Sequence, residues 1–256
     1  MLALGLRMKV VGLTGDSGSG RRTVRGMLEE AWGAGRGFTA VDVDAYVARR
    51  FRRGTPAYAA LLKAAKGKDG ADELTDPKSG ELRPRAVREM AFRDPGVARV
   101  ARSVDVGAAL WAHAVLTWHW VRMRPVVFLV KDDLFVSPAL YWACAAVLYV
   151  DLEPEARARR MAGDEGGDRL EEGRARALAE AEERACPRKQ QADWANFLVY
   201  NAGSLEITRG KVDKLMFAMK YRYWMEHIFS LDTQLLFWFV FLWAYAVFLP
   251  PAVYTW

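Results

Sequence analysis

Residues 9–23 read KVVGLTGDSGSGRRT, an apolar run followed by a glycine-rich turn and the beginning of a helical pattern. Apolar side chains then recur at helical spacing as far as Trp32. This order predicts a strand over Lys9–Thr14, a phosphate-type loop and a helix over Arg22–Trp32.

Further apolar runs predict the rest of that sheet. Strands are expected over residues 39–43, 125–130, 145–151 and 197–200, with a mostly helical pattern over residues 45–124 between them. Strands that alternate with helices indicate an α/β fold with a parallel sheet and helices on both faces. Right-handed crossovers would bring the glycine loop, Asp42, Asp44 and the turn after Val130 to one edge. Residues 168–184, rich in Ala, Glu and Arg, predict an exposed, lid-like helix.

The glycine loop has the spacing of a Walker A motif, GxxxxGK[ST]. Arg21 stands where the motif has lysine, and Arg22 stands where a hydroxyl normally binds magnesium. An arginine can hold a phosphate but offers no oxygen to a metal. The loop is therefore expected to hold a nucleotide without magnesium, and no metal site or required cofactor is predicted. The candidate phosphate-binding residues are Gly15, Gly18, Ser19, Gly20, Arg21, Arg22 and Thr23.

Composition narrows the classes of partner. The net charge is +6, but the arginines are scattered and form no basic stripe interleaved with aromatic residues, so nucleic acid is not an expected partner. The two cysteines match no metal-ligand spacing, and the three histidines lie far from any cysteine or carboxylate cluster. A zinc site is therefore not expected.

The C-terminal segment differs from the rest of the chain. Residues 235–249 contain no charge, and a helix over 228–249 would be about 33 Å long, enough to cross a bilayer. Basic and aromatic residues flank it on the N-terminal side. The expected organisation is a domain over residues 1–220, with a lid-like segment at about 163–190, and a membrane anchor over 221–256. A buried core helix or an oligomer contact is the alternative for residues 228–249.

An ordered series of motifs resembles the dephospho-coenzyme A kinase family, from about Met8 to Leu215. The segments are LTGDSGSGRRTV (13–24), VDVDAYVARR (41–50), GTPAYAALL (54–62), GELRPRAVREMAFRDP (80–95), YVDLEPEARARRMA (149–162) and VYNAGSLE (199–206). The resemblance implies a P-loop kinase fold and transfer of the γ-phosphate of ATP to the ribose 3′-hydroxyl of dephospho-coenzyme A. It also implies that Asp42, the first residue of an Asp-x-Asp pair, is the base for the acceptor hydroxyl.

Other positions depart from the family's pattern. Its strand carboxylate, a later acidic residue, a lid arginine and a later lysine fall on Val130, Val136, Gly163 and Gln191. Phosphoryl transfer depends on positioning and charge stabilisation, so these losses favour an inactive domain in which Asp42 is vestigial. The leading hypothesis is a pseudoenzyme, an accessory subunit of a respiratory complex or ATP synthase in the mitochondrial inner membrane, facing the matrix. Its partners would be other subunits and the lipid bilayer.

Two alternatives stay open at this point. The chain could be a membrane-anchored dephospho-coenzyme A kinase, with Arg21 replacing the lysine and Asp132 or Asp133 replacing the strand carboxylate. It could also be a regulatory module that binds a nucleotide or coenzyme A without catalysis.

Overall fold

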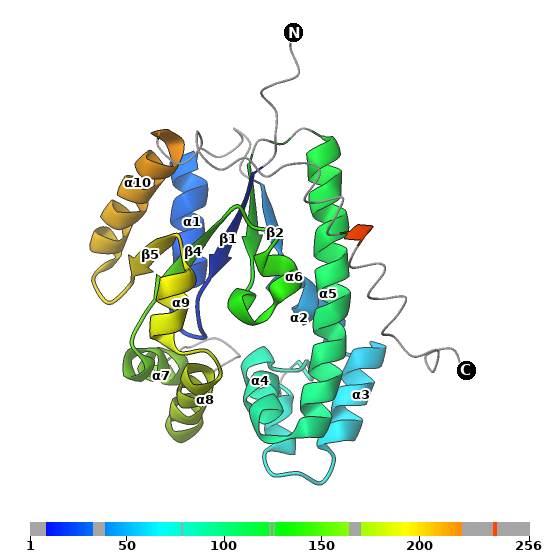
Figure 1. Cartoon of the computed structure of the whole chain (residues 1–256). Helices are drawn as coiled ribbons and strands as arrows, with labels where there is room; N and C mark the ends of the chain where they lie inside the picture. The colour runs from blue at the N-terminus through cyan, green and yellow to red at the C-terminus, as the bar shows by residue number, and fades with distance from the viewer. Residues whose placement is uncertain are drawn as a thin grey trace.

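A parallel sheet of five strands organises the part of the chain that the computed structural model describes, namely residues 9–32, 39–77, 79–122, 124, 126–163, 170–221 and 238–239. The strand order is β2-β3-β1-β4-β5, so the first strand lies at the centre (Figure 1). The strands are β1 (Lys9–Thr14), β2 (Ala40–Asp42), β3 (Val126–Val130), β4 (Ala146–Asp151) and β5 (Phe197–Tyr200). Each predicted strand is confirmed to within two residues at either end.

Burial on both faces explains the continuous apolar runs of the inner strands. β3 and β4 are buried along their whole length, and β1 from its second residue on. The register pairs Leu13 with Val130 on one side and with Leu148 on the other. β-branched side chains dominate these strands because they pack well on a pleated surface that is covered on both sides.

Helices cover both faces of the sheet, as predicted. α1 (Arg21–Trp32) and α10 (Leu205–Tyr221) pack on one face, where Leu28 and Met216 join the core around Leu13. α5 (Pro95–Val121), α6 (Pro138–Tyr141) and α9 (Arg188–Trp194) lie on the other face. Alternate residues of one strand thus belong to separate cores, as the period of two requires.

A third core lies among helices beyond the end of the sheet that carries the glycine loop (Figure 1). It joins the N-terminal part of α5 to the shorter helices around it. These are α2 (Val43–Arg50), α3 (Pro56–Ala65), α4 (Pro84–Arg93), α7 (Pro154–Gly163) and α8 (Glu172–Ala185), with the 3₁₀ turn η1 (Ala71–Leu74). A second 3₁₀ turn, η2 (Leu134–Val136), instead packs in the core beside α6. Three of the described helices have a side-chain N-cap, which is Asp42 for α2, Thr55 for α3 and Asp94 for α5.

The helix predicted over residues 168–184 forms as α8, but the expectation that it has no core-facing surface is wrong. Ala175, Leu178 and Ala179 are fully buried, and α8 packs against α7 and α4. A stripe of small side chains is enough for close helix packing even where large apolar residues are few, because alanine lets the helix axes approach.

The predicted membrane span over residues 228–249 lies outside the described residues, except for Trp238 and Phe239. Within the ranges that the structure describes, no helix combines the length and the apolar composition that crossing a bilayer requires. The ring of Trp238 contacts that of His113 on α5, with the centroids 5.5 Å apart.

Candidate functional site

The glycine loop follows β1 and turns directly into α1. Gly18 and Gly20 have φ values of 79° and 89°, in the left-handed region that other residues rarely adopt. A side chain at Gly20 would also collide with the amide of Asn201, which itself donates to the Ser19 carbonyl (2.7 Å). The loop therefore needs glycine at these positions both for its backbone shape and for the close approach of β5's end.

A cavity of about 1490 Å³ opens over this loop. Its walls come from the loop, from α2 and the turn after β3, and from α4, α5 and α7. The volume exceeds the range of about 300–1,000 Å³ that is usual for a single small-molecule site. The cavity is large enough for two substrates side by side.

Arg21 joins the loop to two carboxylates that follow neighbouring strands, Asp44 on α2 after β2 and Asp132 in the turn after β3. Its guanidinium lies 2.7 Å from Asp44 Oδ2, pairs with Asp132 Oδ1, and donates to the Gly15 carbonyl (3.2 Å). The Arg21 side chain is only 10% exposed, and this burial lowers its pKa, although Asp44 and Asp42 oppose the shift. The guanidinium remains cationic at any physiological pH.

The Asp-x-Asp pair lies at the end of β2, as the sequence predicts. Asp42 accepts the Ala45 N–H at Oδ1 (2.8 Å) and pairs with Arg25 at Oδ2. Asp44 accepts the Asp132 N–H (3.3 Å), and burial raises the pKa of its carboxyl, while Arg21 partly offsets that rise. The two aspartates therefore face different cations: Arg25 for Asp42 and Arg21 for Asp44.

The turn after β3 places Asp132, not Asp133, beside the loop. Asp132 pairs with Arg21 and also with Arg88 of α4 (3.3 Å), and its carbonyl accepts the Thr14 hydroxyl (2.8 Å). Val130, where the family has its carboxylate, is buried in the sheet. From the sequence, either Asp132 or Asp133 could substitute for the strand carboxylate. In the structure, Asp132 pairs with Arg21 of the loop, whereas Asp133 pairs with Lys131.

Asp133 belongs to a cluster around the buried Lys131 that the sequence reasoning missed. It lies 2.5 Å from Lys131 Nζ, which also pairs with Asp105 of α5 (3.2 Å). Burial alone would lower the pKa of Lys131, but the two carboxylates outweigh it and raise that pKa. Lysine and aspartates directly after an apolar strand were the available signal, because such charges are buried only when they are paired.

Glu182 of α8 is a second contact that the sequence did not reveal. It accepts from the Ser17 N–H (3.2 Å) and hydroxyl (2.7 Å), and it pairs with Arg157 (2.7 Å) and Arg88 (3.0 Å). Glu182 and Arg157 are both buried. One carboxylate thus connects the glycine loop with α4, α7 and α8.

Two further departures from the family's pattern, at Gly163 and Gln191, lie close to the loop. Gly163 offers no lid cation, but Arg160, one turn earlier, donates to the Ser19 and Asn201 carbonyls (3.4 and 2.9 Å). Gln191, at the lysine position, donates to Asp16 of the loop (3.1 Å). A helix brings residues three apart onto the same face, so the cation is displaced by one turn rather than lost.

The remaining predicted loop residues occupy different environments. Ser19 Oγ is buried and finds no hydrogen-bond partner among the described residues, whereas Arg22 and Thr23 are exposed on the first turn of α1. All three line the large cavity. A buried, unsatisfied hydroxyl beside a glycine loop is suited to donate to an oxyanion.

The carboxylates beside the glycine loop decide whether a magnesium ion could bind there. The described residues include no group of three or more side chains able to hold a metal alone. Magnesium in nucleotide sites, however, is typically held by one or two carboxylates together with phosphates. Asp44 Oδ2 is buried and accepts no hydrogen bond from the described residues, although Arg21 lies beside it. Asp44 and Asp132 therefore provide a fitting pair of ligands.

Comparisons with known proteins agree with this geometry. The model of the family described as CoaE, dephospho-CoA kinase, matches residues 9–206. The dephospho-CoA kinase of Anaeromyxobacter dehalogenans is 28% identical over 209 residues, covering 82% of this chain and 91% of the relative. That of Symbiobacterium thermophilum is 29% identical over 213 residues, covering 80% and 79%. The crystal structure of TT1252 from Thermus thermophilus has a TM-score of 0.54 at 26% identity, covering 83% of this chain and 98% of that one.

These matches overturn the hypothesis of a catalytically inactive subunit. The matching family and the curated relatives are named as kinases, so the pseudoenzyme interpretation is wrong. Its physical argument took the charges missing at Val130 and Gly163 as lost from the site, whereas Asp132 pairs with Arg21 and Arg160 lies at the glycine loop. The placement in the mitochondrial inner membrane as part of a respiratory complex is wrong as well, because the matching relatives are dephospho-CoA kinases of Anaeromyxobacter dehalogenans and Symbiobacterium thermophilum, not subunits of such a complex. The expected partners, other subunits and a bilayer, and the domain boundary near residue 220 stay predictions.

Proposed function

Because the chain belongs to the dephospho-coenzyme A kinase family, we propose that it transfers the γ-phosphoryl group of ATP to the ribose 3′-hydroxyl of dephospho-coenzyme A. The observation that carries the proposal is the meeting of Arg21 with Asp44 and Asp132 at the glycine loop, in a cavity with room for two substrates. A cation and carboxylates on three adjacent strand ends are the parts that phosphoryl transfer requires.

The donor side is assigned to the glycine loop. Its backbone N–H groups and the N-terminus of α1 would bind the β- and γ-phosphates, with Gly15, Gly18, Gly20 and the Ser19 hydroxyl shaping the cradle. Arg21 would exchange part of its pairing with Asp44 and Asp132 for the phosphate oxygens, because a guanidinium binds phosphate in a bidentate manner. Arg22 and Thr23, exposed at the start of α1, would add positive charge and a hydroxyl at the mouth of the loop.

The acceptor side is assigned to Asp42. Its carboxylate would accept the proton of the 3′-hydroxyl as the oxygen attacks the γ-phosphorus, while the bond from that phosphorus to the β-phosphate oxygen breaks and ADP leaves. Arg25 would pair with one oxygen of Asp42, and the Ala45 N–H would fix the orientation of the carboxylate. Arg160, beside the loop, would contribute positive charge as negative charge moves to the leaving group.

Magnesium enters this proposal through Asp44 and Asp132, because Arg22 cannot bind it. Held there together with the phosphates, the ion would neutralise charge on the transferring group. The prediction of a nucleotide bound without metal is thus replaced by a proposal in which the ligands come from the strand ends. Removing divalent cations with a chelator separates the two, because a metal-free mechanism would leave turnover unchanged.

The test is the formation of coenzyme A by the full-length chain. The protein is incubated with ATP, magnesium and dephospho-coenzyme A, and the product is identified by mass spectrometry and by its 3′-phosphate. Turnover that falls by about 10²–10³ in Arg21→Gln, with Arg159→Gln unaffected, would support the assignment. Arg159 is a matched control because it is exposed on α7 and undergoes the same change of charge. A complete lack of product at every magnesium concentration would refute the proposed activity.

A further inference from the structure

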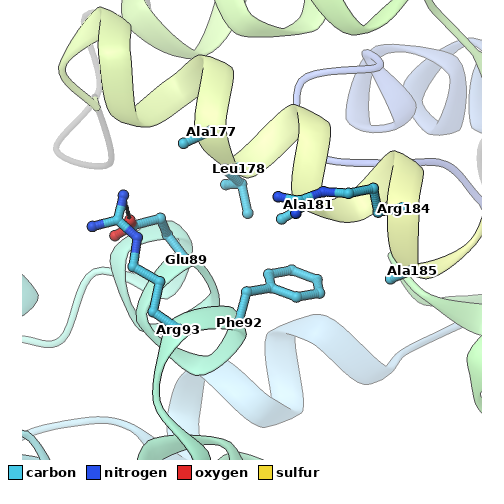
Figure 2. A pocket seen from close by; sticks show the side chains of 8 residues that line it. All are labelled: Glu89, Phe92, Arg93, Ala177, Leu178, Ala181, Arg184 and Ala185. Carbon is cyan, nitrogen blue, oxygen red and sulfur yellow. Dashed lines mark ion pairs between the residues drawn. The ribbon is translucent and has the colours of Figure 1, made fainter.

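A second, smaller hollow lies between α4 and α8. Its volume is about 360 Å³, and we name it the α4–α8 slot. Figure 2 shows the ring of Phe92 and the side chain of Arg184 projecting into the space between the two helices, with Glu89 and Arg93 farther along. Its lining residues are Glu89, Phe92, Arg93, Ala177, Leu178, Ala181, Arg184 and Ala185.

The walls of the slot are apolar in the middle and cationic at the edges. α8 presents three alanines and Leu178, and α4 presents Phe92, whose side chain is 43% exposed. Arg93 lies 2.5 Å from the buried carboxylate of Glu89, so it is held against the wall (Figure 2). An exposed aromatic ring opposite a row of alanines leaves apolar surface that a narrow ligand can cover.

The slot adjoins the large cavity, because Phe92 and Ala185 line both. It also lies on the acceptor side. α2, which begins beside Asp42, packs against α5, and α5 packs against α4. The wall that α4 and α5 contribute to the cavity carries three cations, Arg85, Arg88 and Arg102. A molecule with a hydroxyl at Asp42 and a central diphosphate would meet cations before it reaches the slot.

We propose that the α4–α8 slot binds the pantetheine arm of the acceptor, with Phe92 against the branched dimethyl group and Arg93 and Arg184 near the amides. The inference rests on the proposed function and adds to it the residues that distinguish dephospho-coenzyme A from simpler adenosine phosphates. The arm is narrow, amphipathic and uncharged, which suits a slot with an apolar floor and hydrogen-bond donors at its edges.

The experiment compares ligands with and without the arm on the full-length protein. Dissociation constants for dephospho-coenzyme A, AMP and ATP are measured by calorimetry for the wild type, Phe92→Ala and Ala181→Leu. Phe92→Ala removes the aromatic ring from the α4 wall of the slot. Ala181→Leu fills the slot from the α8 wall without removing a contact. Phe217→Ala is the matched control, since Phe217 is 67% exposed on α10 and lines neither hollow. Thermal melts check that each variant is folded.

The proposal expects a rise of about tenfold or more in the dissociation constant of dephospho-coenzyme A for both slot variants. AMP and ATP should stay within about twofold, and the control should match the wild type. Unchanged binding of dephospho-coenzyme A, equal weakening of AMP, or weakening of ATP alone would each overturn it. If the wild type binds dephospho-coenzyme A but forms no coenzyme A, the proposed activity fails while the binding comparison still decides the slot. A wild type that does not bind dephospho-coenzyme A overturns the slot assignment.

Discussion

Arg21 illustrates how one substitution is accommodated at the level of single residues. An arginine in the lysine position brings a wider cation into the loop, and the chain balances it with Asp44 and Asp132. The pairing also leaves Arg21 partly neutralised before a substrate arrives. A carboxylate that pairs with the loop cation in the free protein is available to a metal once the cation turns to phosphate.

The proposed role of Asp42 as the general base can be tested by a single substitution. In Asp42→Asn, kcat should fall by about 10²–10⁴, because the amide cannot accept the proton of the hydroxyl. Asparagine is as good an N-cap as aspartate, so the helix that begins after Asp42 should keep its stability. Steady-state kinetics and denaturant unfolding of the same preparation measure both effects. A kcat within about twofold of the wild type would exclude Asp42 as the base.

We expect protonation of Asp133 to lower the free energy of unfolding in acid. Burial alone would raise the pKa of its carboxyl, but Lys131 and Arg88 outweigh burial and lower it. A pKa below the ordinary value of about 4 means that Asp133 stabilises the fold at higher pH and that this stability is lost as the pH falls.

The corresponding measurement is the free energy of unfolding between about pH 7 and pH 2. The wild type should lose stability more steeply below about pH 4 than Asp133→Asn, which has no carboxylate to protonate there. At neutral pH the variant should be less stable by about 1.5–3 kcal/mol, the range for a hydrogen bond to a charged group. Asp69→Asn, at an exposed position, controls for the change of charge. Parallel curves for the wild type and Asp133→Asn would contradict this account.

At the level of elements, α8 is both part of the core and part of the site. Its alanine and leucine side chains pack against α7 and α4, and its Glu182 binds the glycine loop. Its opposite edge forms one wall of the α4–α8 slot (Figure 2). A movement of α8 would therefore alter the contact with the loop and the width of the slot together.

Glu182→Ala should destabilise the fold by about 3–5 kcal/mol, because it leaves Arg157 buried without its closest partner and removes the acceptor for Ser17. Denaturant unfolding at neutral pH measures the loss. Glu180→Ala, on the exposed side of the same helix, should change stability by less than about 0.5 kcal/mol. Equal effects of the two substitutions would show that the Glu182 network does not stabilise the fold.

At the level of the whole molecule, the two proposed substrates approach the large cavity from different walls. The donor side is built on the loop, α1 and Arg160, and the acceptor side on α2, α4 and α5. Each ligand that binds the folded state should raise the free energy of unfolding by about 2.7 kcal/mol at a hundred times its dissociation constant.

Thermal or denaturant unfolding with each ligand alone tests this separation. Arg21→Gln should lose most of the stabilisation by ATP and keep that by dephospho-coenzyme A. Phe92→Ala should show the reverse pattern. Loss of both responses in either variant would mean that the two ligands do not occupy separate walls.

The local features of the site follow from the sequence. Apolar runs predict the five strands, and the glycine spacing predicts the loop, because both depend on residues close together in the chain. The position of Asp42 and Asp44 beside the loop follows from the rule that the carboxyl ends of parallel strands share one edge. The prediction of an exposed helix over residues 168–184 failed because a narrow alanine stripe becomes a packing surface only when another helix lies on it.

Which charges face the loop depends on contacts between residues far apart in the chain. Asp132 rather than Asp133 reaches Arg21, Arg160 occupies the region that Gly163 leaves without a cation, and Glu182 meets Ser17 across 165 positions. Val130 and Gly163 carry no charge, and their positions in the sequence do not decide which nearby charged residues replace them at the loop. Their replacement is set by the distances that helix packing and strand register create, and those distances exist only in the folded chain.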